Sequence, residues 1–257
     1  MLWNAGEDKM IDGLILSFQF FTRIPIKKAV DFNEKNMRYS LFFYPYVGAF
    51  IGSLAAAIYY PLSKLNTNIA SLVAVFVLLF LTGGLHIDGL SDTFDGFLSS
   101  RDRERTMEIM KDSRVGTFGV ISIIFLILSK FVIISSFEKG LPLALILSVV
   151  NSRLGASSII ANKKVARKGG LGDMFHKSNP RNLILINTVI YLVILIFTNY
   201  YYITPLVITF LFDEYFSRWS YKKIGGMTGD TYGAIIEIGE VISLFSFWGI
   251  WGIMQWI

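Results

Sequence analysis

Long apolar stretches, separated by short polar segments, run along most of the chain. A helix needs about 20 mostly apolar residues to cross a membrane, and the sequence offers seven stretches near that length. We therefore expect an all-α fold, a polytopic transmembrane helical bundle with about seven spans and short cytoplasmic or interfacial helices. The predicted spans are residues 40–61, 67–87, 115–137, 141–161, 182–200, 203–217 and 233–256.

The segment before the first predicted span is also apolar, but it is interrupted. Residues 10–26 read MIDGLILSFQFFTRIPI, in which Arg23 and Pro25 break the apolar run. This pattern favours an interfacial or partly inserted helix. No linker rich in Ser and Gly divides the chain, and no fixed-period repeat is visible. The sequence therefore predicts a single integral-membrane domain over residues 1–257.

Composition agrees with a membrane protein and excludes several kinds of site. Only 17% of the residues are charged and 53% are hydrophobic, whereas soluble domains carry about 25% charged residues. The absence of cysteine excludes disulfides, thiolate nucleophiles and zinc sites of the cysteine type. Two histidines are too few for a multi-histidine metal cage. The N-terminal MLWNAGEDKM lacks the order of basic and apolar residues of a cleaved signal peptide.

The basic residues are distributed unevenly between the two sides of the predicted bundle. Of the 24 Lys and Arg, 20 fall in segments on one side, which are residues 1–38, 88–114, 162–181 and 218–232. Cytoplasmic loops carry such an excess, so seven spans place the N-terminus inside and the C-terminus outside. The net charge of +5 is then mostly an orientation signal, and we expect no nucleic-acid partner. The polar motifs also lie on this cytoplasmic side.

The stretch GGLHIDGLSDTFDGF, residues 83–97, places Asp88, Asp92 and Asp95 at i, i+4 and i+7. On a helix this spacing puts all three carboxylates on one face, where they repel each other. A divalent cation would offset the repulsion, and oxygen ligands without a histidine or cysteine cluster favour Mg²⁺ or Mn²⁺. A solvated acidic face remains the alternative.

The following segment, TMEIMKDSRVGTFGV, supplies a second acidic row. Glu104, Glu108 and Asp112 are spaced i, i+4 and i+8, roughly one helical face. Two facing rows would form a magnesium cage, in which Glu108 and Asp112 complete the cage or supply a catalytic base. Lys111 and Arg114 suit a phosphate better than a metal. Simple inside-positive charge is the alternative for these two residues.

Charged residues inside predicted spans indicate function. Glu237 lies within the last span at i+7 from Asp230, and a carboxylate inside a span is functional by default. We expect these acids near the aspartate stripe of residues 88–95, as metal ligands or as partners of Arg153. Arg153, in the middle of a span, should face inward with an acid partner or hold an anionic substrate. Thr228 and Asp230 are substrate-binding candidates, or N-cap groups of the last span.

Two further positions are candidates with equally open alternatives. The stretch GGLGDMFHK contains Asp173, which we take as a substrate-binding candidate, in a loop whose amides could face a phosphate or a carboxamide. A turn between helices explains that loop equally well. His86, two residues before Asp88, would contact a substrate phosphate or orient an aspartate as part of the catalytic group, unless it is a satisfied polar neighbour.

Acidic rows with nearby Arg and Lys at a membrane surface suit transfer of a phosphate-linked group. Mg²⁺ would bridge a diphosphate, basic residues would hold its remaining oxygens, and a carboxylate would deprotonate the attacking group. The pattern DTFDG, followed by EIMKD, loosely resembles the signature of CDP-alcohol phosphotransferases. The match is imperfect, because residue 108 is Glu and the Ala-Arg and later Gly of that signature are displaced.

Four motifs together resemble the cobalamin synthase family: GGLHIDGLSDTFDG, EIMKDSRVGTFGV, GGLGDMF and GGMTGDTYGAIIE. FTRIP and YPYVGAFIG are similar to that family as well, and the resemblance covers nearly the whole chain in the same order. Ile87 and Ser91 are mild departures. The resemblance implies a multi-pass, Mg²⁺-dependent enzyme of the prokaryotic inner membrane, and the distribution of Lys and Arg predicts an active site on its cytoplasmic side. It would join adenosylcobinamide-GDP to α-ribazole or α-ribazole 5′-phosphate and release GMP.

Under this hypothesis a ribazole hydroxyl, taken as the 3′-OH, attacks the β-phosphorus of adenosylcobinamide-GDP. Asp88, Asp92, Asp95 and Glu237 would then hold the metal. One rival is a phospholipid-type CDP-alcohol phosphotransferase, which would make a lipid product. The other rival is a cation transporter, although transporters usually place acids near the midplane in repeated halves. The sequence leaves open whether the protein forms a homo-oligomer.

Overall fold

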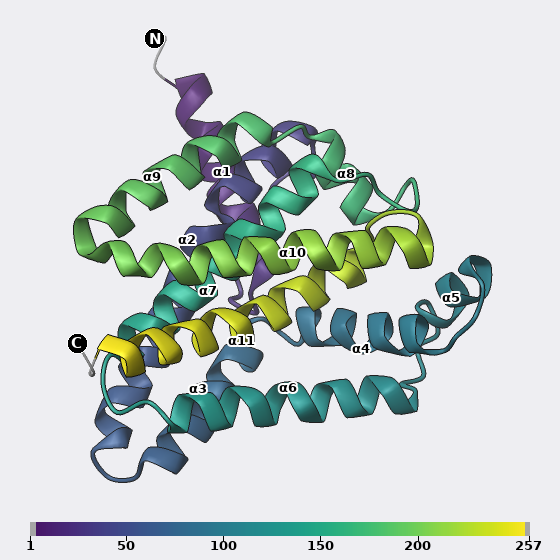
Figure 1. The fold of residues 1–257 in the computed structure, drawn as a ribbon. Helices are drawn as coiled ribbons and strands as arrows, with labels where there is room; N and C mark the ends of the chain where they lie inside the picture. Colours follow the sequence, from purple (N-terminus) through teal and green to yellow (C-terminus); the bar gives the residue numbers. More distant parts are fainter. Residues whose placement is uncertain (1–3, 255–257) are drawn as a thin grey trace.

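The computed structural model of the protein describes residues 4–254, with side chains for residues 10–252. Within this range the regular structure is helical, as Figure 1 shows, and the all-α prediction is confirmed. The elements are α1 Asn4–Phe21, α2 Glu34–Ser63, α3 Thr67–Leu81, α4 Leu85–Leu98, α5 Arg103–Ile109, α6 Thr117–Ser135, α7 Leu141–Asn162, α8 Leu171–Lys177, α9 Arg181–Asn199, the 3₁₀ turn η1 Tyr200–Tyr202, α10 Ile203–Ile224 and α11 Gly229–Met254.

The described helices confirm a membrane bundle, but not the number of seven spans. Five stretches are long and apolar enough to cross a membrane: α2, α6, α7, α11 and the continuous stretch Arg181–Ile224. The predicted spans 182–200 and 203–217 both fall in that last stretch, as α9 and α10, and Figure 1 shows α10 folding back after η1. The last two residues of the predicted span 233–256 lie outside the described residues.

The predicted span 67–87 is broken, and this break determines where the acidic stretch lies. Helix α3 ends at Leu81, and the chain bends by 88° before α4 begins at Leu85. Gly83 and Gly84 make the bend with φ angles of 68° and 76°, a left-handed conformation that glycine adopts without strain. If α3 and α4 count as one broken span, the structure has up to six spans.

Helix α7 is the centre of the bundle. It contacts α2, α8, α9, α10 and α11, and most of its residues are buried. Two glycines of α2 let that helix approach α7 closely, because a Cβ at Gly52 would lie 2.7 Å from the Ile146 Cα. By contrast, α6 and α9 expose large apolar side chains such as Phe125 and Phe197, which are 74% and 86% exposed. Such an outer surface fits contact with lipid.

Helix α4 packs against α11 and α6. Glycines allow the close approach: a Cβ at Gly89 would lie 2.8 Å from the carbonyl oxygen of Asp230, and one at Gly233 would lie 2.8 Å from the carbonyl oxygen of His86. The acidic helix therefore crosses the first turns of α11. This crossing brings two of the motifs that are far apart in the sequence into contact.

Candidate functional site

Two adjoining cavities lie where α4, α8 and the start of α11 meet. Figure 1 shows α4, α5, α8 and the turn between α10 and α11 gathered at one end of the bundle. Each cavity has a volume of about 180 Å³, and they share the wall residues Leu171, Gly172, Gly229 and Asp230. We call the first one, with Lys111, Arg167, Asp173, Thr228 and Asp230 in its wall, the polar cavity.

The second cavity is lined mainly by rings, and we call it the aromatic cavity. Its wall contains His86, Asp88 and Asp230 together with the aromatic residues Phe20, Phe21, Tyr44, Phe175 and Tyr232. The rings pack on one another, with Phe21 stacked on Tyr44 at 3.7 Å between centroids and on Phe175 at 5.9 Å. These residues come from α1, α2, α4, α8 and α11.

A patch of carboxylates lies along α4 and the start of α11. Asp92 is within electrostatic range of Asp88, Asp95 and Asp230. In the part of the chain that the structure describes, the carboxylates of Asp88 and Asp92 make no hydrogen bond or ion pair with another residue. Asp230 accepts a hydrogen bond from the Thr228 hydroxyl at 3.4 Å. Two carboxylates without a protein partner therefore lie close to a third, Asp230. Asp88 and Asp230 line the aromatic cavity, and Asp230 also lines the polar cavity.

Asp95 differs from this pair because its carboxylate has protein partners, and its metal role stays a prediction. Its two carboxylate oxygens accept hydrogen bonds from the backbone amides of Gly116 and Gly119 at 2.7 and 2.8 Å. These amides belong to the N-terminus of α6, where unpaired N–H groups and the helix dipole favour a negative charge. Asp95 thus fastens α4 to α6, and its charge is used for that contact.

The second acidic row is not formed either. Helix α5 ends at Ile109, so Glu108 and Asp112 do not share a helical face. Both are engaged locally, Glu108 by Arg105 and Asp112 by Arg114, each at 2.7 Å. The hydrogen bonds from Arg114 lower the pKa of the exposed Asp112 carboxyl to about 2. Within the described residues, no three acidic or histidine side chains are arranged to hold a metal ion by themselves.

Of the two basic candidates in this segment, the structure brings only one to the site. Lys111 lines the polar cavity, whereas the Arg114 side chain is 88% exposed and paired with Asp112. Substrate binding by Arg114, and a metal-cage or base role for Glu108 and Asp112, are therefore not supported by the geometry. The physical reason is that Glu108 and Asp112 form ion pairs with near neighbours in α5 and in the turn after it. Their carboxylates and the Arg114 guanidinium are therefore paired locally, and not with the aspartates of α4.

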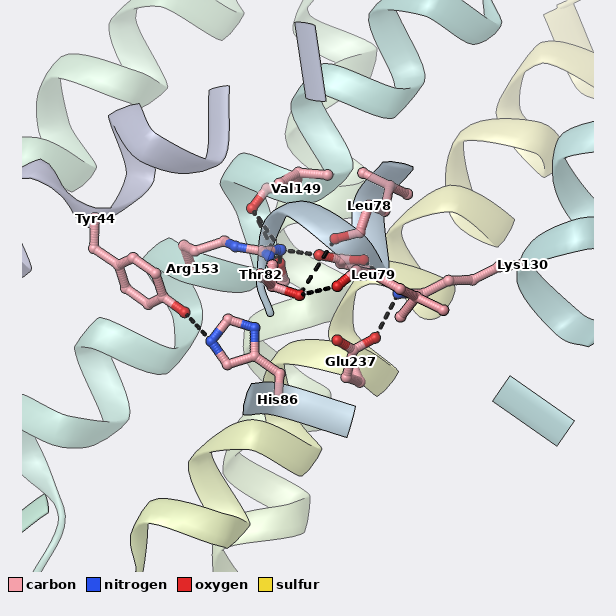
Figure 2. Close-up of polar contacts among 11 residues, drawn as sticks. Tyr44, Leu78, Leu79, Thr82, His86, Lys130, Val149, Arg153 and Glu237 are labelled. Atoms are coloured by element: carbon pink, nitrogen blue, oxygen red, sulfur yellow. Dashed lines mark hydrogen bonds and ion pairs between the residues drawn. The ribbon is translucent and has the colours of Figure 1, made fainter. Parts of the chain in front are cut away.

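Charges buried between α6, α7 and α11 form a separate cluster, drawn in Figure 2. Lys130 donates to Glu237 and to Glu240 at 2.5 Å each, and Arg153 pairs with Glu240 and donates to Ser152 at 3.0 Å. None of the four charged side chains is more than 2% exposed. The expectation that Arg153 faces inward with an acid partner is confirmed, and the partner is Glu240.

This buried cluster corrects two predicted roles. The Glu237 carboxylate is bound to Lys130, so the structure places it in an ion pair and not among ligands of a metal at the aspartate stripe. Arg153 is 1% exposed and lines neither cavity, so it has no access to a substrate there. Buried charges of this kind persist only when they are paired, and here the pairing fixes three helices relative to one another.

His86 connects this cluster with the aromatic cavity. Its Nε2 and the Tyr44 hydroxyl form a hydrogen bond of 2.9 Å, which is drawn in Figure 2, and Tyr44 also lies within electrostatic range of Arg153. The other ring nitrogen of His86, Nδ1, is buried without a hydrogen-bond partner among the described residues. His86 thus has one nitrogen bound to Tyr44 and one that is buried without a partner among the described residues, in a side chain that lines the aromatic cavity.

The polar cavity is assembled from two loops held together by backbone hydrogen bonds. The amide of Ala166 donates to the Met227 carbonyl at 2.8 Å, and the Met227 amide donates to the Lys164 carbonyl at 2.9 Å. This pairing carries Arg167 to the cavity wall, where it interacts electrostatically with Asp230. The cavity therefore combines two basic side chains, Lys111 and Arg167, with a carboxylate.

The structure assigns the two remaining candidates mostly local roles. Asp173 lines the polar cavity, but its carboxylate accepts from the Gly169 amide at 2.8 Å and from Lys177 at 2.7 Å. The Gly169 amide is the main cause that lowers the pKa of Asp173. Thr228 precedes α11 and accepts from the Thr231 amide at 3.3 Å, so the N-cap alternative for Thr228 is confirmed.

Several residues of the site escaped the sequence analysis. Arg167 lies in a loop whose basic charge by itself indicates only orientation. In the separate buried cluster, Glu240 follows Glu237 by three residues on the same helical face. That spacing was a usable signal. Phe175 and Tyr232 carry no sequence signal of their own, because aromatic residues are frequent throughout a membrane protein.

The fold and the site define a polytopic membrane protein with an acidic patch beside a basic, glycine-walled cavity. Comparison with known sequences then identifies the family. The family model described as cobalamin-5-phosphate synthase matches residues 13–248, and the chain belongs to that family. No solved structure shows a significant match.

Curated relatives cover nearly the full length of the chain. A protein of Clostridium novyi is 41% identical over 243 residues, which is 92% of this chain and 97% of its own. One of Treponema denticola is 36% identical over 90% of this chain and 95% of its own. One of Caldanaerobacter subterraneus is 39% identical over 92% and 98%. All three are named adenosylcobinamide-GDP ribazoletransferase.

Proposed function

We propose that the protein is an adenosylcobinamide-GDP ribazoletransferase that acts late in cobalamin biosynthesis. Family membership and the names of the relatives support this reaction. The observation in the structure that carries it is that Asp88 and Asp92, two carboxylates without a protein partner, lie close to Asp230, which lines the cavity walled by Lys111 and Arg167. Such a site suits a diphosphate ester, because cations and basic side chains can share its negative charge.

In the proposed reaction, a hydroxyl oxygen of α-ribazole or its 5′-phosphate forms a bond to the phosphorus that carries the cobinamide. The bond from that phosphorus to the bridging oxygen breaks, and GMP leaves with the electron pair. The proton of the attacking hydroxyl passes to a carboxylate. Asp230 is our candidate for this proton acceptor, because it lies in the walls of both cavities and is thus nearest to both reactants.

The residues of the site fit a magnesium ion. Mg²⁺ usually binds through one or two carboxylates and completes its shell with waters and substrate phosphates. Asp88 and Asp92 supply two such carboxylates without protein partners, so a cage of three or more acids is not required. When bound, the ion would neutralise charge on the diphosphate and the leaving GMP. Lys111 and Arg167 would hold the remaining phosphate oxygens and orient them.

We further propose that the reaction takes place at the cytoplasmic face of the inner membrane of a prokaryote. The site lies at the end of the bundle that carries the basic segments, including Lys111 and Arg167, and cytoplasmic segments carry the Lys and Arg excess. Both proposed substrates and GMP are water-soluble, so a site at this face would exchange them directly with the cytoplasm.

The test replaces Asp92 by Asn in the reconstituted protein. Asp92→Asn removes one negative charge at nearly unchanged volume, and we expect GMP release from adenosylcobinamide-GDP and α-ribazole to fall by about 100-fold or more. Asp31→Asn, at an exposed position before α2, is the matched control and should keep full activity. Normal turnover in Asp92→Asn, with both variants inserted alike, would contradict the assignment.

A further inference from the structure

We propose that the aromatic cavity binds the benzimidazole-type ring of the acceptor nucleoside, while the polar cavity binds the diphosphate and the leaving nucleotide. This inference rests on the proposed function and names the subsite of one of its two substrates.

The walls of the aromatic cavity suit a flat, largely apolar heterocycle. Phe20, Phe21 and Phe175 pack edge-on or stacked, with centroid separations of 5.2 Å between Phe20 and Phe175 and 5.9 Å between Phe21 and Phe175. Aromatic rings prefer such offset and edge-to-face neighbours. A cavity of about 180 Å³ has room for a bicyclic ring, whereas the macrocycle of a cobinamide is far too large for it.

Two residues of the same wall each carry a buried polar atom without a partner among the described residues. The atoms are the Tyr232 hydroxyl and the Nδ1 of His86, and their side chains belong to residues only 5% and 3% exposed. A buried polar group without a partner costs free energy. A ligand that offers one matching atom would remove that cost, so these atoms indicate a binding site and not only a packing space.

The Tyr44 hydroxyl can donate its proton to Nε2 of His86. A neutral imidazole that accepts at Nε2 carries its proton at Nδ1, and we assign this tautomer to His86 as part of the proposal. The Tyr232 hydroxyl can also donate. The wall therefore offers donors to an apolar ring that carries an acceptor.

This pattern distinguishes the two bases in the proposed reaction. The dimethylbenzimidazole of ribazole is apolar and has one free imino nitrogen, which is an acceptor. Guanine carries several donors and acceptors on its edges. Asp88 and Asp230 could accept from its donors, but its acceptors would lose hydrogen bonds against the phenylalanines of the wall. The polar cavity, with Lys111 and Arg167, is the better place for the guanosine nucleotide.

The shared wall gives the two subsites a common reaction point. Gly172, Gly229 and Asp230 lie in both cavities, and a side chain at Gly229 would meet no atom within 4 Å, so the space beside it is open. A ribose attached to a ring in the aromatic cavity would lie at this opening. Its hydroxyls would then face the diphosphate and Asp230.

The test measures equilibrium binding of α-ribazole and of GMP to the purified protein in nanodiscs. Tyr232→Phe removes an unpartnered hydroxyl and should not impair folding. We expect the Kd of α-ribazole to rise about fivefold, as for one lost hydrogen bond, with the Kd of GMP unchanged. Tyr191→Phe, which removes a buried hydroxyl bonded to Asn151 at 2.8 Å outside both cavities, is the matched control and should alter neither Kd.

A pair of ligands tests His86 without relying on a variant alone. The indole analogue of α-ribazole lacks the imino nitrogen, and we expect the wild-type protein to bind it about fivefold more weakly than α-ribazole. In His86→Phe the two ligands should bind equally. Two results would overturn the assignment of the aromatic cavity. One is equal binding of α-ribazole and its indole analogue to the wild type, and the other is a higher Kd for GMP in Tyr232→Phe.

The outcomes also separate this inference from the function on which it rests. A wild-type protein that releases GMP only when α-ribazole is present, but whose Tyr232→Phe and His86→Phe variants bind α-ribazole normally, keeps the function and loses the subsite. A wild-type protein that neither binds α-ribazole nor transfers to it overturns both.

Discussion

Asp88, Asp92 and Asp95 share one face of α4, yet their carboxylates meet different neighbours. Asp95 binds the first amides of α6, whereas Asp88 and Asp92 have no protein partner in the described part of the chain. At the scale of single residues, the spacing along the sequence predicted the shared face correctly. The spacing could not show which carboxylate makes packing contacts. The amides of Gly116 and Gly119 come close to Asp95 only because the chain turns before and after α5.

Because Asp95 makes protein contacts and Asp92 does not, substitutions at these two positions should affect stability differently. Asp95→Ala removes two hydrogen bonds to the N-terminus of α6 and should lower the free energy of unfolding by about 1–2 kcal/mol. Asp92→Ala removes no protein contact and relieves repulsion, so it should leave stability unchanged or raise it. Thermal unfolding in detergent, followed by circular dichroism, measures both. A larger destabilisation by Asp92→Ala would show that the roles are reversed.

At the scale of helices, the break between α3 and α4 and the contact between α4 and α11 position the site. A continuous apolar pattern over residues 67–87 predicted one straight span, but Gly83 and Gly84 adopt left-handed angles and turn the chain by 88°. The double glycine was visible in the sequence. The bend that it makes could not be predicted, because glycines in membrane helices also allow close packing of straight helices, as Gly52 does here.

The contact at Gly89 gives a prediction for this scale. In Gly89→Ala the new Cβ would lie 2.8–2.9 Å from backbone atoms of Asp230, so α4 and α11 must separate. We expect transferase activity to fall by about tenfold or more, because a displacement of about 1 Å in a catalytic site is that costly. Gly249→Ala, on α11 with no atom within 4 Å of its new Cβ, is the control. Equal activity of the two variants would contradict the packing.

At the scale of the whole molecule, the buried cluster of Lys130, Arg153, Glu237 and Glu240 ties α6, α7 and α11 together. The sequence predicted the membrane bundle, because apolar stretches of spanning length leave few other folds. It did not predict which buried charges pair, since Lys130 and Glu240 are 110 residues apart. Only the packing of the helices brings them together.

Removing the central cation tests this role. Lys130→Met leaves Glu237 without its partner and should destabilise the bundle by about 3–5 kcal/mol, the usual cost of an uncompensated buried charge. The double variant Lys130→Met/Glu237→Gln removes that charge and should regain part of the stability. The measurement is the thermal unfolding midpoint of the wild type, of Lys130→Met and of the double variant. A Lys130→Met protein as stable as the wild type would contradict the pairing.

The central claim is that Asp88 and Asp92 hold the diphosphate of adenosylcobinamide-GDP through a divalent cation. The most direct measurement is GMP release by the reconstituted protein from adenosylcobinamide-GDP and α-ribazole, titrated with Mg²⁺ after removal of metal by EDTA. The account predicts no release without the cation, full recovery on adding Mg²⁺, and a higher Mg²⁺ requirement in Asp88→Asn. Release that is unaffected by EDTA, or the same Mg²⁺ requirement in wild type and variant, would contradict it.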